Sequence, residues 1–275
     1  MRFRKTLGVL ALALVGGVLT YAPAAQAAGT PGDHVLGHRC RTYETKVTNE
    51  NTVAALRDTA EMPGAICEID AITIADGTVV VVHDGTFRRV GKASTFPAGV
   101  TATTRVANTT WAQVSQIRTK GGEPIARLED MIRAAGQYHI GLYVDMRNRL
   151  PNPSALVTLA NQVGANVGYY QLLQGNCSHA NIDRMRAAGA PVGVKLLGEC
   201  PTTPAQMQAM GATFTQQLSF FLSDAYIADA NARGITVGVL DRGMTEATAE
   251  ALAARGVQKF LLNEPKEALT WFSGD

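Results

Sequence analysis

The sequence predicts a (β/α)₈ barrel, and two observations support this fold class. From Ile140 onward, strand-like and helix-like segments alternate regularly, and repeated βα units imply a parallel sheet with right-handed crossovers. Two earlier strands bring the count to eight units within about 250 residues, the number and length typical of this barrel. The alternative is an open doubly wound sheet, but Leu36-Gly37-His38-Arg39 is not the glycine-rich nucleotide loop that normally follows its first strand.

The first half of the chain supplies the first two strands, a hairpin and a small insertion. A turn signal at Asp76-Gly77, followed by a β-branched run, predicts the hairpin. The long polar segment 91–110 predicts a small insertion after the second strand. The expected elements are strands at 33–39, 65–74 and 79–82, and helices at 50–60, 111–117 and 128–135.

The second half of the chain contains the regular alternation. Four glycines stand directly before predicted strands, where they are typical helix-stop residues: Gly189, Gly211, Gly234 and Gly256. The expected strands are 140–146, 168–173, 191–196, 212–215, 235–240 and 257–262. The expected helices are 153–163, 179–188, 203–210, 224–233, 246–255 and one from 264.

Residues 1–27 have the features of a secretory signal peptide. Arg2, Arg4 and Lys5 form a basic start, residues 7–19 form an apolar core, and Ala25-Gln26-Ala27 is a small-residue cleavage site. The alternative is an N-terminal membrane anchor, but the apolar run is short for a span of about 20 residues. We therefore expect a secreted protein whose single barrel domain covers residues 28–275.

The charge of the predicted mature chain suggests neither of two common classes of partner. Without residues 1–27 the chain has 22 basic and 23 acidic residues, so its formal charge is −1. This balance gives no support for nucleic acid or an anionic membrane surface as a partner, and we expect no stable membrane association. The sequence does not predict the oligomeric state.

Four cysteines lie in the predicted mature chain: Cys40, Cys67, Cys177 and Cys200. An even number in an exported protein favours disulfides, and four cysteines allow three pairings. We favour Cys40–Cys67 and Cys177–Cys200, because each pair would join neighbouring segments of the chain. The second pair would contribute roughly 3 kcal/mol on the chain-entropy model. Free buried thiols are the alternative.

Polar side chains are concentrated where predicted strands end. His38-Arg39 ends the first strand, and Glu68 and Asp70 end the second and face the same way because strand side chains alternate. His83-Asp84 ends the hairpin, while Asp145 and Arg147 end the next barrel strand. Active sites of these barrels lie at the carboxyl ends of the strands. We therefore expect all these groups to meet on one rim.

The chemistry of these groups suits a phosphate ester. Glu68, Asp70 and Asp145 could hold a hard divalent cation through oxygen, and an ion-pair network on the rim is the structural alternative. Imidazole titrates near neutral pH, so two histidines can act as general acid and base. Arg39 and Arg147 could each grip phosphate oxygens with a bidentate fork.

The order of these motifs resembles the glycerophosphodiester phosphodiesterase family. The resemblance rests on His38-Arg39, Glu50-Asn51-Thr52, Glu68-x-Asp70, Asp76-Gly77 and His83-Asp84 with Arg88 four residues on. It continues through the segments 110–117 and 124–135 and the strand ending in Asp145-Met-Arg147, and returns at 262–265. Three positions depart from the family pattern, because Cys40 replaces Gly, Asp145 replaces Glu and Arg147 replaces Lys.

The resemblance implies a barrel with a small inserted segment and a divalent cation, Ca²⁺ or Mg²⁺, held by Glu68, Asp70 and Asp145. It also implies His38 and His83 as the acid/base pair and Arg39 as a phosphate contact. Glu50 and Asn51 would be supporting site residues. The sequence does not decide which histidine is the acid.

These inferences predict hydrolysis of small glycerophosphodiesters to glycerol 3-phosphate and an alcohol. One alternative is a phospholipase D-like or sphingomyelinase D-like enzyme of the same barrel group that acts on lipids. The pair Phe220-Phe221 could then touch a membrane, although packing is the simpler role for it. The other alternative is a secreted, non-catalytic protein that binds a phosphorylated ligand.

Overall fold

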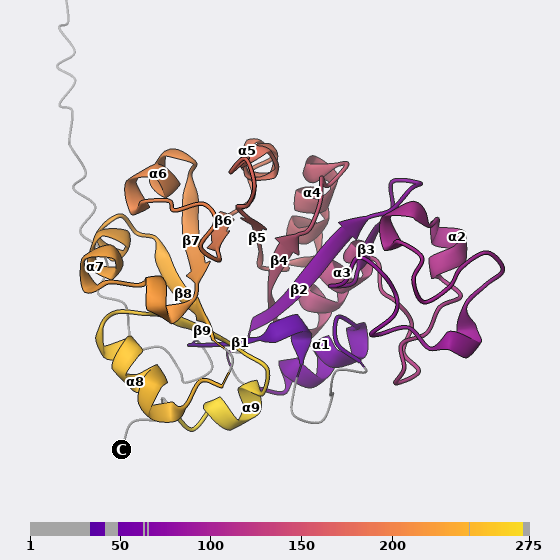
Figure 1. Cartoon of the computed structure of the whole chain (residues 1–275), viewed down its shortest axis with the longest axis horizontal. Coiled ribbons are helices and arrows are strands. Elements are labelled where there is room, and N and C mark those ends of the chain that lie inside the picture. Colours follow the sequence, from indigo (N-terminus) through magenta and orange to yellow (C-terminus); the bar gives the residue numbers. More distant parts are fainter. Residues whose placement is uncertain (1–33, 42–48, 63, 65, 242, 272–275) are drawn as a thin grey trace, which may run out of the picture.

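The structure, a computed structural model, describes residues 34–41, 49–62, 64, 66–241 and 243–271. The predicted signal peptide lies outside these residues. Eight parallel strands close into a barrel in the order β1-β2-β4-β5-β6-β7-β8-β9, with β9 pairing back to β1 (Figure 1). The predicted fold class is therefore confirmed. The strands are β1 (Val35–Gly37), β2 (Ile66–Thr73), β3 (Val79–Val81), β4 (Gly141–Met146), β5 (Val167–Leu172), β6 (Val192–Leu196), β7 (Ala212–Gln217), β8 (Thr236–Leu240) and β9 (Lys259–Leu262).

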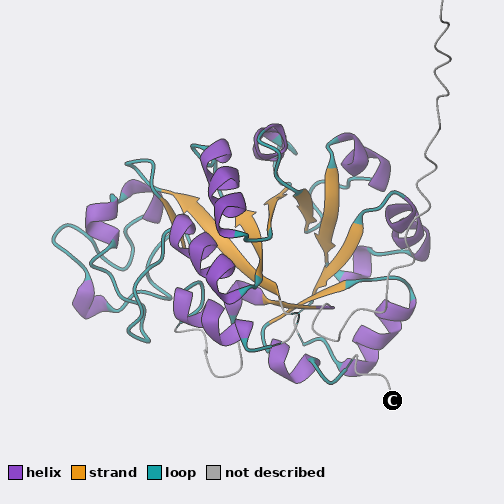
Figure 2. Ribbon diagram, turned by 180° about the vertical axis from the view of Figure 1, so that it is seen from behind, coloured by secondary structure: helices purple, strands orange, loops and turns teal. Residues whose placement is uncertain are grey.

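Helices follow the barrel strands and lie around the outside of the sheet, as the view from behind shows clearly (Figure 2). The helices are α1 (Val53–Ala60), α2 (Trp111–Val114), α3 (Leu128–Tyr138), α4 (Pro153–Val163), α5 (Ala180–Ala187), α6 (Pro204–Ala209), α7 (Asp224–Ala232), α8 (Glu246–Ala254) and α9 (Pro265–Ala268). Short 3₁₀ turns are η2 (His38–Cys40), η3 (Ala93–Thr95), η4 (Val106–Asn108) and η5 (Ser219–Phe221). Among the described residues, none of the helices is both long and apolar enough to cross a bilayer.

The first strand is shorter than predicted. It ends at Gly37, and η2 replaces the expected strand end, with positive φ angles of 61° at Arg39 and 53° at Cys40. The helix expected from residue 50 begins at Val53, because the Thr52 hydroxyl caps it by accepting a hydrogen bond from the Ala55 backbone N–H at 3.1 Å. The preceding residues stay outside the helix and are free to serve the site.

The insertion after the second strand has its own small core. Strand β3 pairs antiparallel with β2 as a hairpin, and the chain from β3 to α3 then extends beside the barrel (Figure 1). A separate cluster of buried apolar side chains holds this region together. Its members are Ile72, Ile74, Val80, Val82, Phe87, Val90, Val100, Val106, Val114, Ile117 and Ile125. The insertion is therefore an ordered unit packed against the rim.

Aromatic rings fill the barrel interior below the rim. Tyr143 stacks on Phe214 with ring centroids 4.4 Å apart, and Tyr170 meets both rings edge-on. Gly168 and Gly193 make room for this pair, since a Cβ on Gly193 would collide with Phe214 at 2.4 Å and one on Gly168 would crowd both rings at 3.0 and 3.1 Å. The aromatic layer forms the floor beneath the polar groups at the carboxyl ends of the strands.

Two disulfides join the segments favoured by the sequence. Cys40 bonds to Cys67, with Cα atoms 4.7 Å apart, and Cys177 bonds to Cys200, with Cα atoms 5.7 Å apart. The first ties η2 to β2 inside the core, where both cysteines are fully buried. The second joins the segments that follow β5 and β6.

Candidate active site

Three buried carboxylates form the centre of the site. Glu68 and Asp70 are two residues apart on β2, so both point into the barrel, while Cys67, Ile69 and Ala71 point into the core outside it. Asp145 on β4 lies beside Asp70 in the parallel register of the two strands. One oxygen from each of the three carboxylates lies within 4.8 Å of the others. Because side chains alternate between the two faces of β2 and β4, the inward-facing carboxylates of these neighbouring strands form the predicted acidic cluster.

Three cationic side chains surround the carboxylates. Lys195 on β6 places its Nζ atom 3.0 Å from Asp145 Oδ2 and 3.8 Å from Glu68 Oε1. Arg147 Nη1 lies 3.4 Å from Asp145 Oδ2, and Arg39 Nε lies 3.8 Å from Asp70 Oδ2. Both predicted arginines therefore meet the cluster. Lys195 was missed in the sequence, although a lone lysine in the apolar strand 192–196 was an available signal.

The buried carboxylates repel one another even though three cations lie beside them. Burial, followed by the negative charges of Glu68 and Asp145, raises the pKa of Asp70 to about 7. Burial opposes the charge of Lys195, but the carboxylates of Asp145 and Glu68 outweigh that effect and raise the pKa of this lysine. A further positive charge at this place would therefore be stabilised.

The oxygen atoms of the cluster fit a hard divalent cation. Asp70 Oδ1 and Asp145 Oδ1 are buried and have no hydrogen-bond partner among the described residues, although Arg147 Nη1 lies 3.7 Å from Asp70 Oδ1 as an ion pair. Both oxygens of Glu68 accept hydrogen bonds, from Tyr170 Oη at 2.6 Å and from the Arg39 backbone N–H at 2.9 Å. Buried carboxylate oxygens that lack hydrogen bonds are costly, and Ca²⁺ and Mg²⁺ prefer carboxylate oxygen ligands.

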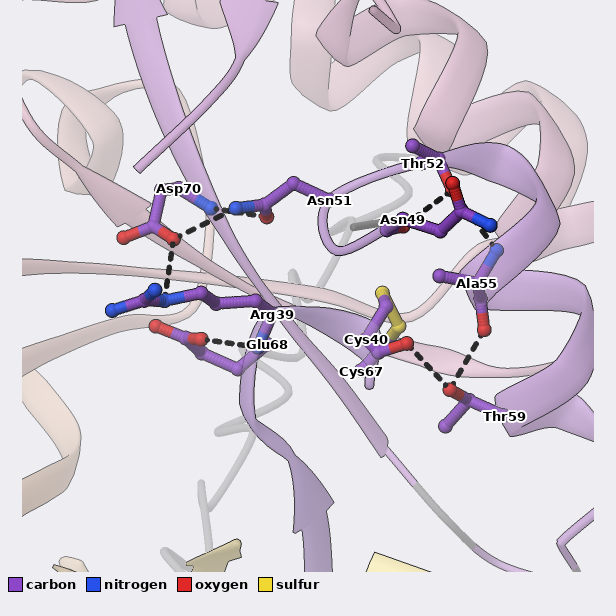
Figure 3. The surroundings of a disulfide bond; sticks show 10 residues. All are labelled: Arg39, Cys40, Asn49, Asn51, Thr52, Ala55, Thr59, Cys67, Glu68 and Asp70. Carbon is purple, nitrogen blue, oxygen red and sulfur yellow. Dashed lines mark hydrogen bonds and ion pairs between the residues drawn. A yellow bond between two sulfur atoms is a disulfide. The ribbon is translucent and has the colours of Figure 1, made fainter. Parts of the chain in front are cut away.

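Asn51 and the first disulfide lie close to the two carboxylates that β2 contributes, Asp70 and Glu68 (Figure 3). Asn51 Nδ2 donates to Asp70 Oδ2 at 3.0 Å, and its Oδ1 accepts the Asp70 backbone N–H at 3.1 Å. The Cys40–Cys67 bond lies next to both Arg39 and Glu68 in the chain, and these two residues also share a hydrogen bond. The backbone of η2 is thus fixed to the strand that carries two of the carboxylates.

His38 lies at the edge of the cluster and contacts Asn263, which directly follows the last barrel strand, β9. Its Nδ1 lies 2.7 Å from Asn263 Oδ1, which also accepts a hydrogen bond from Arg41. Since the amide oxygen only accepts, His38 Nδ1 carries the proton and Nε2 is left with its lone pair. Burial, followed by the charge of Arg39, lowers the pKa of His38 to about 3. The ring is therefore neutral at ordinary pH.

His83 belongs to a chain of ion pairs that leads back to the cluster. Its Nδ1 lies 2.6 Å from Asp84 Oδ1, and Arg89 Nε lies 2.7 Å from Asp84 Oδ2. Arg89 Nη2 also bonds Glu50 Oε1 at 2.6 Å, and Glu50 in turn accepts from Arg39 at 3.1 Å. These arginines outweigh the effect of burial and lower the pKa of Glu50.

Arg89 is a second residue that the sequence reasoning missed. The motif spacing singled out Arg88, but Arg88 is exposed and Arg89 makes both ion pairs. The residues after the hairpin form turns rather than a strand, so the alternation of strand side chains does not predict which way they point.

All nine predicted catalytic, phosphate-binding, supporting and metal residues lie in this rim network or next to it.

A cavity of about 490 Å³ opens between the barrel rim and the insertion. His83 and Arg147 line it from the barrel side, and Arg105 lines it from the insertion. Its remaining lining residues are small, apolar or neutral, so the cavity presents positive charge. This space can take an anionic or polar ligand beside the carboxylate cluster.

A barrel with carboxylates, histidines and arginines on its carboxyl rim is the arrangement expected of an enzyme for phosphate esters. Residues 38–166 match the model of the Glycerophosphoryl diester phosphodiesterase family, a segment that includes all nine predicted residues named above. This segment, just under half of the chain, is therefore similar to the glycerophosphodiester phosphodiesterase family. Lys195 and Asn263 lie beyond the matched segment.

A curated protein and several solved structures are similar to the chain at low identity. The mouse glycerophosphoinositol inositolphosphodiesterase GDPD2 is 24% identical over 156 residues, which are 48% of this chain and only 28% of the mouse protein. Three similar solved structures share the fold, all at under 25% identity. A glycerophosphodiester phosphodiesterase from Parabacteroides distasonis has a TM-score of 0.69 and 16% identity over 89% of this chain and 98% of that one.

The other two structures cover similar shares of the chain. A phosphodiesterase from Oleispira antarctica, in complex with the product sn-glycerol-3-phosphate, has a TM-score of 0.70 and 16% identity over 88% of this chain and 97% of that one. A glycerophosphodiester phosphodiesterase from Agrobacterium tumefaciens has a TM-score of 0.67 and 17% identity over 86% of this chain and 99% of that one.

Proposed function

We propose that the protein hydrolyses glycerophosphodiesters to glycerol 3-phosphate and a free alcohol, with the help of a divalent cation. The observation that carries this proposal is the buried group of Glu68, Asp70 and Asp145, bordered by two histidines and two arginines. The Oleispira antarctica relative with bound sn-glycerol-3-phosphate supports this choice of product.

Glu68, Asp70 and Asp145 would hold the cation, either Ca²⁺ or Mg²⁺. When bound, it would supply positive charge to the phosphodiester oxygens and stabilise the charge that develops there in the transition state. Arg39 and Arg147 contact the same carboxylates, and each keeps donors that can grip a phosphate oxygen. Glu50 and Asn51 hold Arg39 and Asp70 in place.

The two histidines divide the proton transfers. His38 is neutral and has a free lone pair on Nε2, so it takes the proton of the attacking hydroxyl, from water or from the substrate's neighbouring glycerol hydroxyl. The Asp84 carboxylate accepts from His83 Nδ1, which directs Nε2 of His83 toward other partners. His83 then protonates the departing alcohol, and the arginines that line the same cavity suit the anionic phosphate group.

We also propose that the protein is secreted and that its substrate is a soluble diester rather than a lipid. Residues 1–27 are proposed as a cleaved signal peptide before a barrel domain at 28–275, and two disulfides suit an oxidising compartment outside the cell.

A lipid phosphodiesterase is the second candidate, because Phe220 is 73% exposed and Phe221 is 42% exposed beside the rim strand β7. The rings contact each other, but their exposure does not support the packing role that we expected for the pair.

One panel separates the two candidates. The enzyme is assayed with Ca²⁺, Mg²⁺ or chelator on glycerophosphocholine, glycerophosphoethanolamine and glycerophosphoinositol, and on vesicles of phosphatidylcholine or sphingomyelin. Release of glycerol 3-phosphate from the soluble diesters, with untouched vesicles, supports the first reading. Cleavage of the vesicles with little turnover of soluble diesters would establish the lipid enzyme instead. Tight binding of the diesters without turnover would indicate a binding protein.

A further inference from the structure

Lys195 is the most deeply buried cation beside the acidic cluster. Its side chain is 5% exposed, against 12% for Arg39 and 30% for Arg147. It reaches across the barrel from β6, and its Nζ atom lies over the ring of Tyr170, 5.3 Å from the centroid. A buried ammonium is costly unless it is paired, so its position is set by Asp145 and Glu68.

Lys195 and a cation would use different oxygens of the cluster. The ammonium bonds Oδ2 of Asp145, while Oδ1 of Asp145 and Oδ1 of Asp70 are buried without hydrogen-bond partners in the described part of the chain. The lysine therefore does not fill the place of the proposed metal. It adds a fixed positive charge at one side of that place.

We propose that Lys195 is a permanent counter-cation of the metal site, which holds the carboxylates together in the metal-free protein and weakens divalent binding. This role rests on the metal site of the proposed function. The three carboxylates repel one another when no cation is bound, and Lys195 offsets this repulsion from inside the barrel. The same charge repels an incoming Ca²⁺ at short range, where burial limits solvent screening. Lys195 is thus a positioning residue.

Calorimetric titration with Ca²⁺ at pH 8 tests this proposal on the full protein. Lys195→Met keeps the length and apolar stem of the side chain and removes its charge. We expect the variant to bind Ca²⁺ at least tenfold more tightly than wild type, equivalent to about 1.4 kcal/mol. Its melting temperature in chelator should fall, and Ca²⁺ should raise that temperature by more than it does in wild type. Lys120→Met is the matched control, since Lys120 is exposed on the insertion.

A double-mutant cycle with Asp145→Asn separates this role from simple packing. Asp145→Asn removes the partner charge, so Lys195→Met should change stability in chelator much less in that background. If Lys195→Met folds only with Ca²⁺, or folds again when Asp145→Asn is added, the counter-cation role is supported. If neither change restores folding, Lys195 is a packing residue and the proposal is overturned.

The outcome also distinguishes this proposal from the proposed function. If wild type binds Ca²⁺ and Lys195→Met binds it with equal or lower affinity, the role of Lys195 fails and the metal site stands. If neither protein binds Ca²⁺ or Mg²⁺, both the metal site and the counter-cation role are refuted. If only Lys195→Met binds Ca²⁺, Lys195 weakens Ca²⁺ binding more than we propose, and its counter-cation role is supported.

Discussion

Removing the Cys40–Cys67 disulfide should damage the active site, whereas removing Cys177–Cys200 should lower stability alone. The first bond fixes η2 to β2 directly beside Arg39 and Glu68, and the second joins two segments that contribute no carboxylate to the cluster. The double substitutions Cys40→Ala with Cys67→Ala, and Cys177→Ala with Cys200→Ala, form a matched pair.

The expected losses of stability are similar for the two bonds. The bonded cysteines are separated by 27 and 23 residues. On the chain-entropy model, each loop constrains the unfolded chain by about 3.5 kcal/mol at 25 °C. The first pair should cost somewhat more, because Cys40 and Cys67 are both fully buried and their sulfur atoms leave a void.

The expected losses of activity differ. Arg39 and Cys40 have positive φ angles, 61° and 53°, which cost about 1–3 kcal/mol each and persist only when the surroundings enforce them. Without the disulfide, η2 can relax and withdraw the Arg39 backbone N–H from Glu68. A misplacement of about 1 Å at a reacting centre can cost roughly a hundredfold in rate.

Urea unfolding measures the loss of stability, and kcat/KM for glycerophosphocholine at saturating Ca²⁺ measures the loss of activity. We expect both variants to lose about 3–4 kcal/mol of unfolding free energy, while only the first loses activity by tenfold or more under conditions where both are folded. Equal kcat/KM in the two folded variants would refute the argument that this disulfide positions the site.

Three further predictions concern the histidines, an ion pair and pH. His38→Ala and His83→Ala should each abolish hydrolysis of glycerophosphocholine. A glycerophosphodiester with p-nitrophenol as its leaving group, which needs no proton to depart, should restore activity to His83→Ala alone. If it restores activity to His38→Ala instead, the acid and base roles of the two histidines are reversed. Arg89→Met should lower kcat/KM at least tenfold by releasing Asp84 and Glu50, and Arg88→Met, a control at an exposed position, should leave it within twofold. The folded, metal-free protein holds a proton on Asp70 up to about pH 7 that the unfolded chain releases near pH 4, whereas the lowered pKa of His38 makes stability rise with pH over much of the same range. The Asp70 effect is therefore isolated as the stability of wild type minus that of Asp70→Asn in chelator. This difference should fall as the pH rises from about 4 to about 7. A difference between the two proteins that stays constant or rises from pH 5 to 8 in chelator would contradict the assignment of that proton.

Most of the site could be predicted because it depends on local rules. Glu68 and Asp70 face one way through strand parity, and Asp145 follows from the same rule on the next barrel strand. The disulfide between Cys40 and Cys67 follows from the short chain distance between the first two strands. These features need only element order and alternation, which the sequence displays clearly.

The missed residues depend on distances across the barrel. Lys195 is 50 residues from Asp145 in sequence, and Asn263 is 225 residues from His38. Strand parity alone does not say which inward side chain spans the interior, because that depends on the rings of Tyr143 and Phe214 that fill the floor. Tyr170, which donates to Glu68, was missed for the same reason.

The central claim is that the acidic cluster holds a divalent cation for glycerophosphodiester hydrolysis, and phosphorus NMR of one reaction tests it directly. Chelator-treated protein is mixed with glycerophosphocholine, and Ca²⁺ or Mg²⁺ is then added to wild type and to Asp145→Asn. We predict no turnover before the addition, and afterwards a glycerol 3-phosphate signal from wild type that Asp145→Asn lacks. Full turnover in chelator, or phosphocholine as the product, would contradict the claim.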